Sequence, residues 1–403
     1  MTAAKLHAVP SAGADDLDAL IAHVAEGAAD RDRDRVMPFD LFDRIRASRL
    51  GALRLPKAEG GRGASFRELL EVVIRLAAAD PNVAHALRNH FTFVERHARA
   101  RTAPNREKWA AVVASGALFG LANTELSSPA IGGGGFQTTL TPEGEGWRLD
   151  GVKYYSTGTI FADHVLVRAA GPEGRSASAI VPTIREGVEI VDDWDGAGQR
   201  LTGSGTTYFR NVRAEPDEVV FDTPTVGYGY AYHNTLAQLI VTGVVAGVLR
   251  NVLSDAVALL TSRKDRHFYY ASATSAADDP LLQEIVGEIS AASFAADATV
   301  LAAADTLEEV AEIRDQGLAG VEVAHRAAEA TAKAKLVVDA LTLKSASRLF
   351  DVGGASATKR TKNLDRHWRN ARTLASHNPG PLKARALGAY ELTGEPLPAL
   401  GFF

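Results

Sequence analysis

Apolar residues in the first 120 positions recur at the spacing of amphipathic helices. Runs such as LDALIAHVAEGAA and FRELLEVVIRLAAA place them three or four positions apart. Ser65 is a candidate N-cap for the second run, and Asp80-Pro81 begins a further helix. The pattern predicts that residues 15–120 are mainly helical.

The period changes between Ala117 and Asp222. Short segments such as HVLVRAA and ASAIVPTI are alternating or β-branched, and Gly, Pro and Asp turns separate them. This pattern is typical of an antiparallel sandwich or barrel.

Long helical patterns return from Tyr228, over roughly 228–264, 281–315 and 319–349, with shorter pieces at 363–374 and 380–392. Long helices with few breaks favour a four-helix-type bundle. We therefore predict a multidomain α+β protein: an N-terminal helical domain (1–116), a central antiparallel β-barrel or sandwich (117–225) and a C-terminal four-helix bundle (226–403).

Composition narrows the choice of partners. Lys and Arg number 44 against 49 Asp and Glu, a net charge of −5, whereas nucleic-acid binders usually carry a basic surplus. The uncharged stretch 227–249 contains His233, Asn234 and Gln238, which favour a buried helix over a membrane span. From the charge balance and this stretch we expect neither nucleic-acid nor membrane partners. The N-terminus lacks a signal-peptide core, so we expect a cytoplasmic protein.

The chain contains no cysteine, which excludes disulfides, thiolate zinc sites, iron–sulfur clusters and cysteine nucleophiles. Neither an H-E-x-x-H motif nor the paired Glu-x-x-His of di-iron bundles occurs, so we expect no metal. No G-x-G-x-x-G links a strand to a helix, so nothing indicates a nicotinamide site. The chemistry must therefore use histidines, carboxylates, hydroxyls or an organic cofactor.

Three motifs resemble the acyl-CoA dehydrogenase superfamily. LANTELSSPA at 121–130 resembles its segment beside the flavin pyrimidine, and GVKYYSTG at 151–158 resembles its strand facing flavin N5. FDVGGASA at 350–357 resembles the Gly-Gly turn that approaches the cofactor. The order of helical, β and helical segments agrees with that fold.

The C-terminal helix DRHWRNARTLASH indicates the branch. The glutamate that removes the substrate α-proton in the dehydrogenases falls on Asn378 by an ungapped count, so the expected base is missing. Together with DWDGAGQRLTGSGTT and NLDRHWRNARTLASHNP, this makes the chain resemble the flavin-dependent monooxygenases of the superfamily, which include the dibenzothiophene monooxygenases and sulfur-acquisition oxidoreductases.

The resemblance implies the oxygenase component of a two-component, homotetrameric system. A separate flavin reductase would supply reduced flavin, and the resemblance favours FMNH2 over FAD. The reduced flavin would react with O2 to form a C4a-hydroperoxyflavin, which oxygenates a small sulfur- or nitrogen-containing or aromatic substrate. Two alternatives stay open: a thioester dehydrogenase whose base has moved, for example to Glu125, and a flavin-binding protein without turnover.

The same resemblance assigns catalytic roles. Ser156 would place its hydroxyl near flavin N5, and Asn123 and Thr124 would contact the pyrimidine or N5. His90 would face the substrate and the flavin, while His377, beside the lost base, would hold or give a proton with a pKa near neutral. Each residue also has a structural alternative: Ser156 as a strand-end serine that bonds its own turn, Asn123 as a strand-end cap, His90 as a core or surface histidine and His377 as a C-cap histidine. We expect His85 and His97 to be core or surface residues of that ordinary kind.

Further cofactor contacts are implied. Arg266, before Phe268, resembles an arginine that reaches a flavin phosphate from a neighbouring subunit, and Arg263 and Lys264 compete for this role. The other implied contacts are Thr157, Phe268, Gly353, Gly354 and Ser356. Gly132–Gly135 is either a lid over the substrate or a surface loop, and Trp194 either packs near it or is structural.

Overall fold

The computed structural model describes residues 14–126, 135–263, 267–318 and 320–400. Its N-terminal part is helical, as predicted, and Ser65 caps α4 by accepting a hydrogen bond from the Glu68 amide, which confirms the predicted cap. Pro81 occupies the first turn of α5. The helices are α1 (Ala14–Ala25), α2 (Ala28–Asp34), α3 (Phe39–Ser48), α4 (Phe66–Ala79), α5 (Pro81–Ala86), α6 (Arg88–Phe93) and α7 (Arg106–Ala114).

The central region forms one sheet, in the order β6-β7-β3-β2-β4-β5-β8, with β1 paired to β4. Most neighbours are antiparallel, but β1 and β2 each run parallel to β4, so the sheet is mixed where the sequence predicted an antiparallel one. Alternation reports which face a strand buries, not the direction of its neighbour. The strands are β1 (Phe119–Ala122), β2 (Thr139–Glu143), β3 (Gly146–Lys153), β4 (His164–Ala170), β5 (Ser176–Pro182), β6 (Val188–Ile190), β7 (Thr207–Ala214) and β8 (Val219–Phe221).

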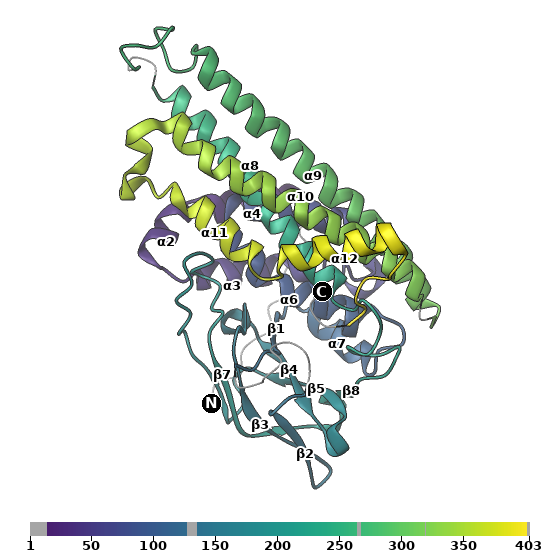
Figure 1. The fold of residues 1–403 in the computed structure, drawn as a ribbon. Helices are drawn as coiled ribbons and strands as arrows, with labels where there is room; N and C mark the ends of the chain where they lie inside the picture. The colour runs from purple at the N-terminus through teal and green to yellow at the C-terminus, as the bar shows by residue number, and fades with distance from the viewer. Residues whose placement is uncertain (1–13, 127–134, 264–266, 319, 401–403) are drawn as a thin grey trace.

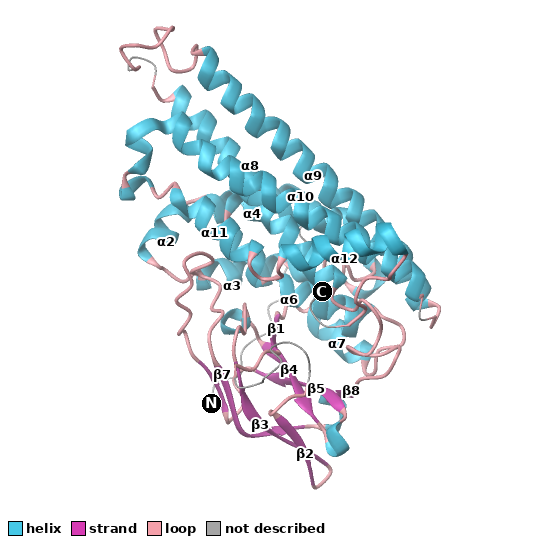
Figure 2. Cartoon of the chain, in the orientation of Figure 1, coloured by secondary structure: helices cyan, strands magenta, loops and turns pink. Residues whose placement is uncertain are grey.

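The C-terminal region is a bundle of long helices, and Figure 1 shows α8, α9 and α10 lying side by side. Its helices are α8 (Thr235–Thr261), α9 (Pro280–Asp315), α10 (Val321–Gly353), α11 (Asp365–Ala375) and α12 (Gly380–Thr393). The strands are grouped at one end of the molecule and the bundle extends from the other (Figure 2). The helical, β, helical order is as predicted; the boundaries at 116 and 225 stay a prediction.

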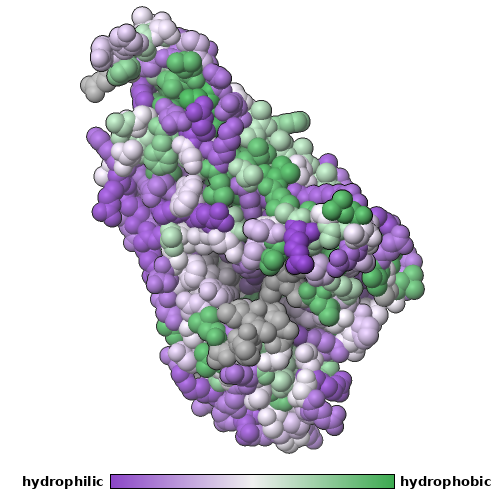
Figure 3. Space-filling view, viewed as in Figure 1, coloured by the Kyte–Doolittle hydropathy of each residue, from purple (hydrophilic) through white to green (hydrophobic). Residues whose placement is uncertain are grey.

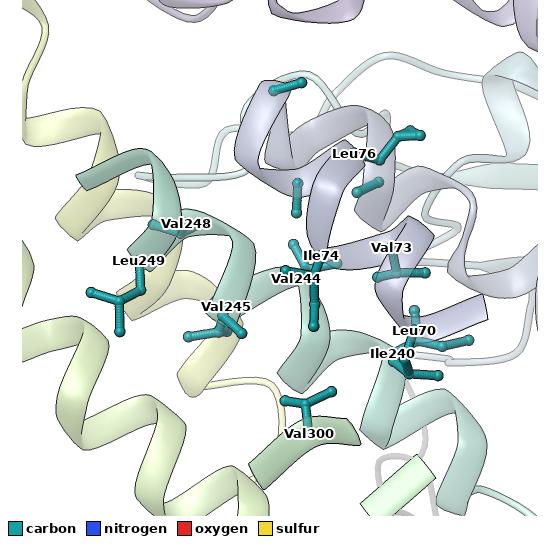
Figure 4. Close-up of a cluster of buried hydrophobic side chains, with 14 of the residues drawn as sticks. Leu70, Val73, Ile74, Leu76, Ile240, Val244, Val245, Val248, Leu249 and Val300 are labelled. Carbon is teal, nitrogen blue, oxygen red and sulfur yellow. The ribbon is translucent and has the colours of Figure 1, made fainter. Parts of the chain in front are cut away.

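The largest core joins the N-terminal helices to the bundle. Side chains of α4, α8 and α9 meet there, including Ile74, Val244 and Val300 (Figure 4). A Cβ at Gly247 of α8 would clash with Ala77 of α4, so glycine permits this close helix approach. Helices α8 and α9 are long and apolar enough, by length and composition, to cross a membrane; the apolar window of α8 is 72% buried in this core.

The loop after β6 docks on α11. The Gly198 amide donates to Thr373 Oγ1 at 3.0 Å, and the Gln199 amide donates to Asn370 Oδ1 at 2.6 Å. A Cβ at Gly198 would overlap the backbone of α11. These contacts bring the central region and the α11–α12 junction, which lie far apart in sequence, to the same place.

Candidate active site

A cavity of about 670 Å³ lies where the three regions meet. One wall comes from the sheet and its loops, a second from α5 and α6, and a third from α11 and the α11–α12 junction. Its described lining residues are His85, Arg88, Asn89, Leu121, Asn123, Thr124, Tyr155, Thr157, Trp194, Gly196, Ala197, Gln199, Ser204, Arg372, Thr373, Leu374, Ser376, His377, Asn378 and Pro379.

The sheet wall is polar but uncharged. Asn123 and Thr124 follow β1, and the Thr124 carbonyl accepts a hydrogen bond from the Tyr154 amide at 2.8 Å, which holds this segment beside the end of β3. Thr157 Oγ1 and Ser204 Oγ lie 2.7 Å apart. The motif residues Asn123, Thr124 and Thr157 are therefore brought together, as the sequence resemblance implied.

Ser156 lies beside this wall but does not line the cavity. Tyr155 and Thr157 line it, whereas Ser156, between them, is fully buried and its Oγ has no hydrogen-bond partner among the described residues. The hydroxyl that the structure presents at the cavity is therefore that of Thr157, one position after the serine singled out from the motif.

Glu125 lies behind the sheet wall in a buried ion pair. It accepts from Lys153 Nζ at 2.6 Å, from Thr138 Oγ1 at 2.7 Å and from two backbone amides. Although burial opposes the charge, hydrogen bonds from Lys153 and Thr138 hold the pKa of Glu125 at about 2. A carboxylate with its oxygens occupied, which does not line the cavity, is poorly placed to act as a relocated base.

The helical wall is basic. His85 ends α5, and Arg88 and Asn89 begin α6, so the three share one face at i, i+3 and i+4 spacing. His85 Nδ1 lies 3.0 Å from Gln199 Oε1, which places the proton on Nδ1, while the buried Nε2 has no partner among the described residues. Sequence reasoning treated His85 as a core histidine; its spacing from Arg88 and Asn89 was the available signal.

His90 lies outside the cavity, contrary to the role that the resemblance assigned it. Its ring is buried against Gly51, and Nδ1 accepts from the Phe119 amide at 3.2 Å. Burial lowers its pKa to about 4. Two positions beyond Arg88 on a helix, His90 faces a different side, so it connects the helices to β1 and does not line the cavity.

His377 reaches the cavity from the α11–α12 junction. Arg88 Nη1 donates to its Nε2 at 2.9 Å, and its Nδ1 donates to Asn378 Oδ1 at 2.6 Å. Burial and the Arg88 charge lower the pKa of His377 to about 3. The imidazole is therefore neutral at pH 7, with its proton on Nδ1, which differs from the expected pKa near neutral. Asn378, the residue on which the ungapped count places the dehydrogenase glutamate, also lines the cavity.

Comparison with known proteins places this geometry in a family. Residues 239–379 match the acyl-CoA dehydrogenase C-terminal domain. The chain is 31% identical to dibenzothiophene monooxygenase from Mycolicibacterium goodii over 86% of each chain. The structure of TdsC from a Paenibacillus species with FMN and indole has a TM-score of 0.87 at 28% identity, covering 96% of this chain and 98% of TdsC. Methanesulfinate monooxygenase MsuC from Pseudomonas fluorescens has a TM-score of 0.84 at 27% identity, covering 98% and 100%.

The chain belongs to the dibenzothiophene monooxygenase family. It is a flavin-dependent monooxygenase with the acyl-CoA dehydrogenase fold, and the resemblance inferred from the sequence motifs is confirmed. The cavity agrees with a monooxygenase more than with a dehydrogenase, because no Asp or Glu is among the described residues that line it.

The cavity residues fit the flavin that this family uses. An isoalloxazine ring is a planar apolar body with hydrogen-bonding edges, and the sheet wall offers the amide of Asn123 with the hydroxyls of Thr124 and Thr157. Buried polar atoms normally have partners, yet His85 Nε2 and Gln199 Nε2, on two residues that line the cavity, have none among the described residues. These atoms mark where further hydrogen bonds are required.

The residues expected to bind the flavin phosphate lie away from the cavity of their own chain. Gly353 ends α10, and Arg263 donates to its carbonyl at 2.6 Å and to Ser356 Oγ at 3.2 Å. Gly354 and Ser356 continue this turn, and Phe268 follows α8 with 66% of its surface exposed. None of these residues lines the cavity. Figure 1 shows the α8–α9 connection at the end of the bundle far from the sheet.

Some predicted positions cannot be placed. Arg266 and Lys264 lie outside the described residues, as do residues 132–134 of the glycine run; Gly135 is described, with a φ of 72°. Trp194 lines the cavity and donates from Nε1 to the Gln199 carbonyl at 2.8 Å. No cluster of three or more His, Asp or Glu residues suited to a metal ion occurs in the described part of the chain.

Proposed function

We propose that this chain is the oxygenase component of a two-component system in the cytoplasm. A separate reductase supplies reduced FMN, and one atom of O2 is transferred to a small sulfur- or nitrogen-containing or aromatic substrate. The FMN and indole named in the TdsC structure, and the methanesulfinate in the name of MsuC, support a cofactor and substrates of this kind.

The observation that carries the proposal is a large cavity that lacks a carboxylate among its described lining residues. Removing an α-proton from a thioester requires a base, and the amide of Asn378 has no useful basicity. Glu125, the other candidate, is locked to Lys153 behind the wall. The dehydrogenase alternative therefore has no carboxylate base among the described residues of the cavity, whereas oxygen transfer does not require a base that removes an α-proton.

Each wall has its own task. Reduced flavin, when bound, activates O2 and supplies the oxygen atom that the substrate receives. Asn123, Thr124 and Thr157 would hold the ring edge by hydrogen bonds. His377 keeps a proton on Nδ1, and its Nε2 accepts a hydrogen bond from Arg88, so as a neutral imidazole it would orient Arg88 and the groups bound beside it.

A shared site between subunits follows from where the phosphate-binding candidates lie. Gly353, Gly354 and Ser356 do not line the cavity of their own chain, so they would serve the cavity of a second chain. Phe268, Leu281 and Phe294 are exposed near or on α9, and Figure 3 shows hydrophobic patches on the bundle surface. We propose a homotetramer, and light scattering that finds a flavin-binding monomer at micromolar concentration would contradict it.

The test is a coupled assay with a flavin reductase, NADH, FMN and air. Dibenzothiophene, indole and methanesulfinate are offered in turn, and products are identified by mass spectrometry after labelling with ¹⁸O2. We expect one labelled oxygen atom in a product. Stoichiometric bleaching of bound oxidised flavin by octanoyl-CoA, without oxygenation of any compound in the panel, would overturn the proposal in favour of a dehydrogenase.

A further inference from the structure

Arg88 differs from the other deeply buried arginines in its partners. Arg54 pairs with two glutamates, and Arg168 pairs with an aspartate. Arg96 lies over the Tyr228 ring at 3.7 Å. Arg88, only 6% exposed, has neither a carboxylate nor a ring face among its partners in the described residues.

The partners that Arg88 does have are neutral. Its Nε and Nη2 donate to Asn89 Oδ1 at 3.2 and 3.1 Å, and its Nη1 donates to His377 Nε2 at 2.9 Å. A guanidinium has more N–H donors than these three hydrogen bonds use. Burial without a counter-charge lowers the pKa of Arg88 to about 10, so it still carries its charge at pH 7.

A buried charge is costly unless a partner compensates it. Arg88 lines the large cavity, and the described lining contains a second cation, Arg372, but no acid. The rest of the lining includes Leu121, Leu374 and Trp194, which suit an apolar body. A ligand with an acidic group at one end and an apolar remainder matches this arrangement.

We propose that Arg88 binds the acidic group of the substrate, and that the natural substrate is a small organic acid: a carboxylate, sulfinate or sulfonate on an apolar body. The planar guanidinium fits such a group because it can donate two parallel hydrogen bonds. Since Arg88 also donates to His377, an acid bound there lies next to a histidine that lines the same cavity. This inference rests on the proposed oxygenase function and specifies its substrate.

The experiment compares a neutral and an acidic ligand of the same shape. Indole and indole-3-carboxylate are titrated calorimetrically into the full-length chain, with and without oxidised FMN, for the wild type, Arg88→Met and Arg88→Lys. The wild type should prefer the acid. Arg88→Met should lose about 10- to 100-fold in affinity for the acid, as expected for a charge-assisted hydrogen bond, and reverse the preference. Arg88→Lys keeps the positive charge but cannot donate two parallel hydrogen bonds, so its affinity for the acid should lie between those of the wild type and Arg88→Met.

Arg372→Gln is the matched control, because it removes an exposed cation that lines the same cavity. It should leave the ratio of the two affinities within about twofold, since exposed charges are screened by water. Indole binding reports whether each variant is folded.

The inference is overturned if the wild type prefers indole, if Arg88→Met keeps its affinity for the acid, or if it loses affinity for both ligands equally. A flavin phosphate is the other anion that Arg88 could bind. If Arg88→Met weakens FMN binding but leaves riboflavin binding unchanged, the arginine belongs to the cofactor and the substrate assignment fails. Selective acid binding in a wild type that oxygenates nothing would instead overturn the proposed function and leave the anion site standing.

Discussion

The two sides of the cavity differ in how they treat charge. The sheet side keeps its charges behind the wall, where Glu125 and Lys153 neutralise each other, and presents only an amide and hydroxyls. The helical side presents Arg88 at the surface of the cavity with neutral partners. A wall whose charges are already paired suits a ligand recognised by hydrogen bonds. A wall that carries a positive charge without a counter-charge suits a ligand that brings a negative charge.

The largest expected effect is on the basic side. Replacing His377 by Ala should lower product formation by about 10²- to 10³-fold, because losing a positioned hydrogen-bonding group in an active site costs about that much. FMN binding should change little, and H2O2 should rise as reduced flavin is consumed without product. Product and H2O2 per NADH, measured at full flavin occupancy, check this.

The control for His377→Ala is His90→Asn, a buried histidine outside the cavity. Asn can still accept a hydrogen bond from the Phe119 amide, so product per NADH should stay at the wild-type value. If the two variants lost product equally, the position of His377 at the cavity would not explain the effect of its replacement.

The next largest effect tests the paired charges behind the sheet wall. Glu125→Gln leaves the Lys153 ammonium buried without a counter-charge, and should cost about 3–5 kcal/mol of the free energy of unfolding. Urea denaturation measures the change. The double variant Glu125→Gln/Lys153→Met should recover much of this loss, because the unpaired charge is then removed. If Glu125→Gln alone lowered the free energy of unfolding by less than about 1 kcal/mol, the ion pair would not be needed to support the wall.

Acid pH should weaken the protein mainly through its buried histidines. Burial lowers the pKa values of His90, His233 and His367 to about 4 and that of His377 to about 3, against about 6.5 in the unfolded chain. Between those values the unfolded chain binds more protons, so stability falls as the pH drops below about 6.5. Each histidine should cost on the order of 1–2 kcal/mol at pH 5.

Urea denaturation at pH 7 and pH 5 tests this sign. A chain that is more stable at pH 5 would contradict it. His377→Asn should show a smaller loss between the two pH values than the wild type, because one of the contributing histidines is then missing.

The smallest effect separates two neighbouring hydroxyls on the sheet side. Thr157→Val should weaken FMN binding about 2- to 12-fold, the value of one neutral hydrogen bond, because Thr157 lines the cavity. Ser156→Ala should weaken it less, because Ser156 does not line the cavity. Fluorescence titration with FMN measures both, and the reverse order would return the flavin contact to Ser156.

These residues show where sequence reasoning reached its limit. The motifs led to segments that line the cavity, through Asn123, Thr124, Thr157 and His377. The reasoning chose His90 because the run NHFTFVE resembles a monooxygenase helix, whereas the packing of the helices brings His85 to the cavity. It gave Ser156 the catalytic role from its place in the motif, but in the segment after β3 it is Thr157 that lines the cavity.

The sequence by itself determined the order of helical, β and helical regions, because hydrophobic periodicity records which face of each element is buried. It also determined the family, because short motifs around a cofactor keep their spacing along the chain. Tertiary structure alone decided the charge state of the site. The low pKa of His377 and the uncompensated charge of Arg88 arise from burial and from contacts between α6 and the α11–α12 junction, and no local pattern encodes contacts between residues almost three hundred positions apart.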